Sequence, residues 1–208
     1  MSNPSGAVPG KETVKFYFDP VCPWAWRASL WMREVQQVRP VNVEWDFLSL
    51  QAVNSGKESL KETHFRSEKG FRIMALLRRK LGAEEANTMI DKLYLELGQA
   101  QHERKEDIGE DAVVEKALSN LGLDTGLLQE AMSDPTTLDD VQKSHEGIVG
   151  KGGFGVPTLV MSKANQELKP AFGPVIDRVP TGEDAGQLWD RVEWLMQRPE
   201  FFELKRSR

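Results

Sequence analysis

Hydrophobic and polar residues follow two different periods along the first fifty positions of the chain. The run Val14–Phe18 is rich in β-forming residues and ends before Pro20, which predicts a strand followed by a turn. From Pro23 the apolar positions fall on one helical face, so a helix is expected up to Pro40. Val41–Leu48 alternates apolar and polar residues, which indicates a second strand. This order predicts a parallel βαβ unit.

Helical patterns fill the middle of the chain. From about Glu58 to Ser133 the sequence shows no strand pattern. Apolar residues recur with a helical period over Ala86–Leu97 and again over Val114–Leu121, and both stripes are expected to face the core.

A further helix is predicted to begin where the helical middle ends. Asp134 and Pro135 are typical of an N-cap and a first helical residue, and Gly150 ends the pattern. The same pattern indicates His145 as a core histidine with satisfied nitrogens. The residues expected to point inward are Leu138, Val141, His145, Ile148 and Val149.

The last part of the chain predicts two short strands and a helix. Val156-Pro157 leads into a strand at Leu159–Met161, and a second strand is expected near Leu168 to Phe172. Thr181 has capping-box spacing relative to Asp184 and predicts the start of the final helix.

Together these elements predict an α/β fold with the order βαβ, inserted helices, α, ββ, α. The expected division is one domain made of residues 13–55 and 134–200, interrupted by a helical subdomain at 56–133. Residues 1–12 and 201–208 are expected to be flexible tails.

Composition excludes several classes of function. The 27 Lys and Arg against 32 Asp and Glu give a formal net charge of −5, which disfavours nucleic acid as a partner. No apolar run approaches the ~18 residues that a membrane span needs, and the first residues lack the features of a signal peptide. The three histidines and single cysteine do not have metal-ligand spacing, so no metal site is expected. We therefore expect a cytoplasmic protein.

Cys22 is the residue best placed for chemistry. The residue before a proline is extended, so Cys22 should be the N-cap of the helix, with Pro23 at its first position. Backbone N–H groups of Trp24 and Ala25 would then point at the sulfur. The positive helix end should lower the pKa of Cys22 from the ~8.5 of an ordinary cysteine toward ~7. The local sequence leaves open the alternative of a buried cysteine that only packs.

The segment Asp19–Trp26 resembles the active-site segment of DsbA-like members of the thioredoxin superfamily, in which the pattern is Cys-Pro-Trp-Cys. Taken with other segments it is similar to the mycothiol-dependent reductases and nitroreductases of actinobacteria. Those segments are Ser144-His145, Val156–Thr158, Phe172–Val175, Gly186–Asp190 and Phe201–Arg206. The resemblance implies a thioredoxin fold with an inserted helical subdomain and covers nearly the whole chain from Val14.

The sequence departs from this pattern at Ala25, where the family has its second, resolving cysteine. Either the protein is naturally a single-thiol enzyme, or a cysteine was replaced to trap an intermediate. The resemblance further implies a cis bond at Val156-Pro157, beside Cys22. It also implies that Trp24, Asn54 and His102 approach the substrate. His64 stands where the family has tyrosine, which puts a role for it in doubt.

The resemblance implies a thiol-disulfide reductase that uses Cys22 and a low-molecular-weight thiol, mycothiol, as co-substrate, without a tightly bound cofactor. Disulfides or nitro-aromatic small molecules are the implied substrates, and a homodimer is a possible assembly. Two alternatives stay open. One is a kappa-type thiol transferase or isomerase, whose members usually have serine in place of Cys22. The other is a thioredoxin-like binding module without catalysis, which Ala25 favours.

Overall fold

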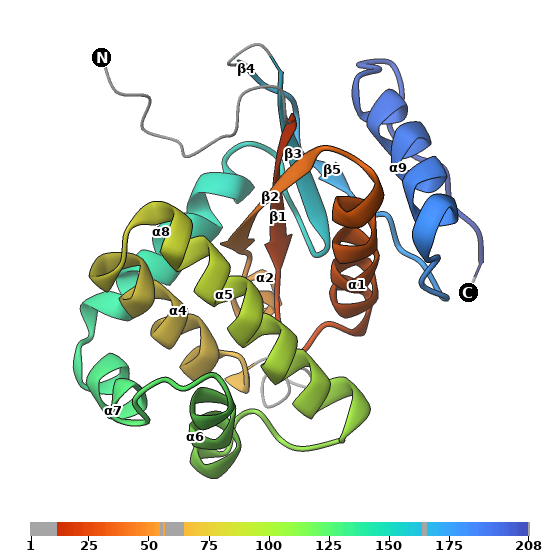
Figure 1. Ribbon diagram of the computed structural model, residues 1–208. Helices are drawn as coiled ribbons and strands as arrows, with labels where there is room; N and C mark the ends of the chain where they lie inside the picture. Colours follow the sequence, from red (N-terminus) through yellow and green to blue (C-terminus); the bar gives the residue numbers. More distant parts are fainter. Residues whose placement is uncertain (1–11, 55, 57–64, 164–165, 208) are drawn as a thin grey trace.

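A computed structural model describes residues 12–54, 56, 65–163 and 166–207, and Figure 1 shows how its elements are arranged. His64 and the predicted start of the helical stretch at Glu58 lie outside the described residues. The strands are β1 (Glu12–Phe18), β2 (Val41–Phe47), β3 (Thr158–Lys163), β4 (Gln166–Glu167) and β5 (Ala171–Phe172). The helices are α1 (Pro23–Val38), α2 (Leu50–Val53), α4 (Glu68–Lys80), α5 (Ala83–Gly98), the π-helix η2 (Gln99–Glu103), α6 (Asp111–Asn120), α7 (Gly126–Ser133), α8 (Thr136–Val149) and α9 (Gly182–Met196).

One mixed sheet organises the molecule. β1 pairs parallel with β2, from Glu12 opposite Val41 to Phe18 opposite Phe47. β3 runs antiparallel on the other side of β1, and both β4 and β5 pair antiparallel with β3. The alternating burial of β2 confirms the pattern seen in its sequence. The order β1-α1-β2, inserted helices, α8, β3-β5, α9 confirms the predicted thioredoxin fold with a helical insertion.

Helices α1 and α9 lie side by side (Figure 1). Trp31 of α1 donates its indole N–H to the carbonyl of Ala185 in α9 at 3.1 Å. At the end of α1, Arg39 forms ion pairs with Glu183 and Asp190 of α9, both at 2.8 Å. These contacts hold α1 against α9, and they therefore also restrict the loop that leads into α1.

Aromatic side chains join the helical insertion to the sheet. Tyr94 of α5 stacks on Phe18 of β1 with ring centroids 3.9 Å apart. The Tyr94 ring also makes a T-shaped contact with Trp26 of α1, with ring centroids 6.2 Å apart. Phe71 of α4 packs against the same Phe18 ring at 5.9 Å. Since Phe18 ends β1, the insertion packs close to the loop that begins α1.

Several predicted positions were wrong in detail. Leu138 and Val149 of α8 are 42% and 43% exposed, because the buried stripe of this helix is narrow and centres on Val141 and Ile148. His145 is half-buried, but its Nδ1 is buried without a hydrogen-bond partner, so it is not the satisfied core histidine that we expected.

Two other details differ from the sequence pattern. The strand expected near Leu168 to Phe172 is divided, and residues 168–170, which end in a proline without an N–H group, belong to neither β4 nor β5. Thr181 makes no side-chain cap bond to α9. Instead Glu34 of α1 accepts the N–H of Gly182 at 3.0 Å, so a neighbouring helix supplies the cap.

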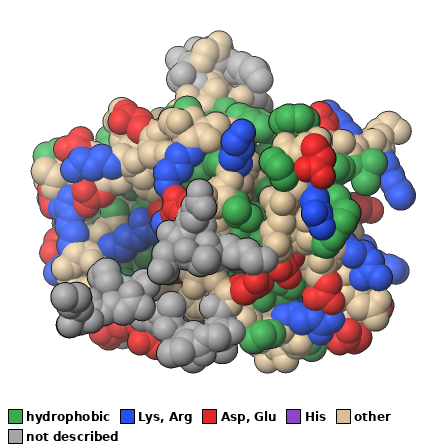
Figure 2. All heavy atoms as spheres, turned by 90° about the horizontal axis from the view of Figure 1, so that it is seen from above, with side chains coloured by type: hydrophobic (Ala, Val, Ile, Leu, Met, Phe, Trp, Pro, Cys, Tyr) green, Lys and Arg blue, Asp and Glu red, His purple; other side chains and the backbone are tan. Residues whose placement is uncertain are grey.

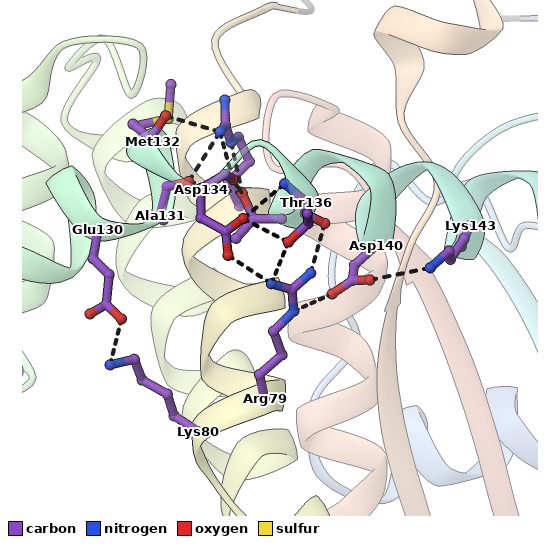
Figure 3. A network of polar contacts seen from close by, with 11 residues as sticks. Arg79, Lys80, Glu130, Ala131, Met132, Asp134, Thr136, Asp140 and Lys143 are labelled. Atoms are coloured by element: carbon purple, nitrogen blue, oxygen red, sulfur yellow. Dashed lines mark hydrogen bonds and ion pairs between the residues drawn. The ribbon is translucent and has the colours of Figure 1, made fainter.

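Two arginines of α4 hold the junction between α7 and α8. Arg79 donates to Asp134, Thr136 and Asp140 (Figure 3). Arg72 is buried, and its guanidinium donates to Thr137 and to the carbonyl oxygens of Ala131, Met132 and Asp134. The last carbonyls of α7 therefore find their donors on α4 rather than in water.

The surface carries mixed charge. Acidic and basic side chains are interspersed over the face shown in Figure 2. Within the described ranges, we find no helix that combines the length and the apolar character needed to cross a membrane.

The buried guanidinium of Arg72 yields a stability prediction. Replacing it in the variant Arg72→Met should lower the free energy of unfolding by about 3–5 kcal/mol, because Glu68 and three carbonyls lose their donor inside the protein. Arg79→Met, at a more exposed position on the same helix, should cost less. Urea unfolding of both variants measures the difference, and equal losses would contradict this account.

Candidate active site

Cys22 lies at the junction between the sheet and α1, as its sequence predicts. It is the N-cap residue with extended dihedrals, φ −79° and ψ 115°, and Pro23 begins the helix. The Ala25 N–H donates to its sulfur at 3.5 Å. Cys22 keeps 6% of its surface exposed. The helix terminus favours the thiolate form of this sulfur, and its burial opposes that form.

The loop before β3 meets the same sulfur. The Cys22 thiol donates to the carbonyl oxygen of Val156, with sulfur and oxygen 3.6 Å apart. The Val156–Pro157 peptide bond is cis. Thr158 donates its hydroxyl to the Gly155 carbonyl at 2.7 Å, and this bond fixes the loop from within. Two segments more than 130 residues apart in sequence thus converge on one sulfur atom.

His102 reaches the active-site turn from the helical insertion. It lies in the π-helix η2, and its Nε2 is 2.8 Å from the carbonyl oxygen of Pro20. Because a carbonyl only accepts, Nε2 carries the hydrogen in this contact. The ring stacks on Trp26 at 5.8 Å. Burial lowers the pKa of His102, although the bond to Pro20 opposes this effect. The imidazole is therefore a neutral donor that holds the turn.

Trp24 and Asn54, the other two residues that the resemblance implies near the substrate, each contact a neighbour on their own element. Trp24 is half-buried, and the Arg27 guanidinium lies 5.0 Å above its ring. Asn54 ends α2 and donates its side-chain amide to the Leu50 carbonyl at 3.1 Å. The structure therefore brings Cys22, Ala25, Val156 and Pro157 together directly, and it connects His102 through Pro20.

Sequence reasoning gave Asp19 no role of its own, although it included this residue in the turn after the first strand and in the segment that carries the family resemblance. Its side chain is fully buried and accepts the backbone N–H of Val21 at 3.1 Å and of Leu50 at 2.8 Å, together with the Ser67 hydroxyl. Its own carbonyl accepts the N–H of Cys22 at 3.0 Å. The bond to Val21 closes an Asx-turn. Aspartate favours such turns, so the Asp-Pro pair in the sequence was the feature that could have indicated it.

This arrangement suits chemistry at sulfur. A thiolate can form at the helix start, where the Ala25 N–H donates to the sulfur, and the Val156 carbonyl of the loop before β3 lies beside it. Ala25 is fully buried and presents no second sulfur to the first. Among the described residues, no group of three or more His, Cys, Asp or Glu side chains is arranged to hold a metal ion.

Three comparisons place this geometry among known proteins. A protein of Mycobacterium tuberculosis (strain ATCC 25618 / H37Rv), named "Uncharacterized protein Rv2286c", is 34% identical over 199 residues, which cover 94% of this chain and 82% of that protein. The cytosolic disulfide reductase DsbM from Pseudomonas aeruginosa has a TM-score of 0.57 at 15% identity, covering 88% of this chain and 99% of DsbM.

A 2-hydroxychromene-2-carboxylate isomerase has the same TM-score of 0.57 at 14% identity, covering 88% of this chain and 94% of that one. The two solved structures therefore share the fold with this chain and differ in their named activities, so the fold alone does not select the chemistry.

The sequence match to a family is more specific. Residues 21–206 match the family described as "Mycothiol-dependent nitroreductase Rv2466c", and this stretch contains Cys22, His102 and Val156–Pro157. The chain therefore belongs to the Rv2466c-like family, which is described by its mycothiol-dependent nitroreductase.

Proposed function

We propose that the protein is a thiol-disulfide reductase that uses Cys22 as its nucleophile and mycothiol as its co-substrate. The observation that carries the proposal is the position of the Cys22 sulfur, which accepts the Ala25 N–H at the start of α1 and faces the Val156 carbonyl. The family description supports mycothiol as the thiol. Such a reductase works in the cytoplasm, where thiols are kept reduced.

The reaction follows from a single sulfur. The Cys22 thiolate attacks the mycothiol sulfur of a mixed disulfide, an S–S bond forms between Cys22 and mycothiol, and the substrate leaves as a thiolate that takes a proton from water. A second mycothiol, as thiolate, then attacks the enzyme-bound mycothiol sulfur. Mycothiol disulfide leaves and the Cys22 thiolate is regenerated. The substrate gains two electrons, and two mycothiol molecules supply them by forming one disulfide.

Residues around the sulfur have separate proposed roles. The backbone of Val156, before Pro157, pairs with the substrate and holds its sulfur in line with Cys22. Trp24 and Asn54 contact the substrate, and His102 fixes the turn before Cys22 through Pro20. The word nitroreductase in the family description supports nitro-aromatic compounds as a further substrate class.

Trapping the intermediate tests both the nucleophile and the role of position 25. Incubation with mycothiol disulfide should give a stable adduct of one mycothiol per chain, seen as a mass increase by mass spectrometry. In Ala25→Cys the adduct should disappear, because a second thiolate on the first turn of α1 displaces mycothiol and forms an internal disulfide.

The matched control is Ala25→Ser, which adds a hydroxyl that cannot displace mycothiol. This variant should keep the adduct as the parent chain does. If the parent chain forms no adduct under conditions where iodoacetamide still alkylates Cys22, mycothiol is not the co-substrate. An adduct that persists in Ala25→Cys would show that position 25 does not resolve the disulfide.

The variant Cys22→Ser separates covalent redox catalysis from isomerase or transferase chemistry on the same fold. A serine hydroxyl forms no disulfide, so mycothiol-dependent reduction should fall to the rate of the uncatalysed reaction. Steady-state turnover with a mycothiol mixed disulfide measures this loss. Activity that survives the substitution would instead favour the thiol transferase or isomerase alternative.

A further inference from the structure

Asp19 is a buried acidic group that the proposed reaction does not use. Its side chain is 0% exposed, and the three groups that it accepts from, Val21 N–H, Leu50 N–H and the Ser67 hydroxyl, are all neutral. A buried carboxyl group without a cationic partner is costly, so its presence in the core calls for a reason.

The three donors come from three different parts of the chain. Val21 belongs to the turn before Cys22, Leu50 is the first residue of α2, and Ser67 is the residue before α4. The carboxyl group therefore joins the turn before Cys22, the start of α2 and the N-cap residue of α4 at a single point. Through the Leu50 carbonyl the same contact extends to Asn54.

We propose that Asp19 is a positioning residue for Cys22, because its carboxyl group fixes the active-site turn against α2 and the start of α4. The inference rests on the proposed function, since it concerns the reactivity of the same thiol. Asp19 touches no substrate in this account. It acts by placing Cys22 relative to the Val156 loop and by contributing a negative charge to the turn in which the Asp19 carbonyl accepts the Cys22 N–H.

The charge of Asp19 connects this arrangement to pH. Burial raises the pKa of Asp19 to about 6, although its three hydrogen bonds oppose the rise. The ionisable groups that face this region are Cys22 in the turn, Tyr94 of α5 and His102 of η2. Arg66, beside Ser67, pairs with Asp107 at 3.3 Å.

The sign of the effect on stability follows from linkage. The pKa of Asp19 is higher in the folded protein than its ordinary value of 3.8, so between about pH 4 and 6 the folded state binds more protons than the unfolded state. Asp19 should therefore stabilise the fold as pH falls through this window, and this contribution should be lost as pH rises above 6.

The test compares two reactions of Cys22 in the full chain and in Asp19→Asn. Asparagine keeps the shape but removes the charge, and its amide N–H₂ must face one of the three donors. Iodoacetamide is small and reports the thiolate, whereas mycothiol disulfide also needs the correct placement of the sulfur.

In Asp19→Asn the midpoint of the thiolate titration should fall by on the order of one pH unit, since a negative neighbour is gone. The rate with mycothiol disulfide should nevertheless fall roughly tenfold, because one contact of the turn is broken. A residue that only stabilises the fold would leave both reactions unchanged in the folded variant. That result, with circular dichroism showing an intact fold, would overturn the proposal.

Ser67→Ala is the matched variant, and it keeps the proposal testable if Asp19→Asn does not fold. Losing one donor raises the pKa of Asp19 further, so an inflection near pH 6 in the alkylation profile should move to higher pH. An inflection that persists in His102→Gln belongs to Asp19, whereas one that disappears belongs to the histidine and would overturn the proposal. An unchanged profile in Ser67→Ala would overturn the proposal.

Failure of the proposed function would look different. If mycothiol disulfide does not react with the parent chain, the co-substrate is wrong, yet the iodoacetamide profile still reports whether Asp19 acts on Cys22. If the alkylation profiles of the parent chain and Asp19→Asn coincide while mycothiol disulfide reacts normally with both, the role of Asp19 is wrong and the reductase proposal stands.

Discussion

The structure depends on one constraint, which is that the first turn of α1 begins at a cysteine followed by a proline. Pro23 pre-sets the helix start and leaves Cys22 extended, so the sulfur takes the place of an N-cap oxygen and accepts the Ala25 N–H. A helix start has unpaired N–H groups in any protein. Here one of them, the Ala25 N–H, meets a sulfur atom, and the proposed chemistry starts from this contact.

The rest of the fold holds that helix start in place. α9 packs along α1 and is capped by Glu34, while Arg39 joins the two helices at the end of α1. On the insertion side, Tyr94 stacks on Phe18 at the end of β1, and His102 binds the Pro20 carbonyl. The inserted helices therefore contact the end of β1 and the turn before Cys22 in addition to packing among themselves.

The single cysteine and the cis-proline loop lie on a fold that supports more than one activity. The similarity to a disulfide reductase and to an isomerase, both at a TM-score of 0.57, shows that the architecture alone leaves the chemistry undecided. The family match and the retained Cys22 narrow the choice to oxidoreductase chemistry. In the proposed mechanism Ala25 leaves release of the product to a thiol from solution, because the described site offers no second thiol.

Local patterns in the sequence determined much of this protein. The alternation in Val41–Phe47, the helical period after Pro23 and the extended residue before that proline are set by neighbours along the chain, and each agrees with the structure. The resemblance carried by Asp19–Trp26 and by the shorter segments later in the chain indicated the family. These features could be predicted because short-range backbone preferences do not depend on distant partners.

Tertiary structure alone decided which distant groups meet. The burial of Asp19 among donors from three segments joins residues far apart in the chain, and no local pattern indicated that the Nδ1 atom of His145 is buried without a partner. The contact between Cys22 and Val156 also joins distant segments, and only the family resemblance implied it. The exposure of Leu138 and Val149 was likewise set by how α8 packs, not by its apolar period. Burial and long-range hydrogen bonds depend on which surfaces the folded chain brings together, and no local pattern encodes that choice.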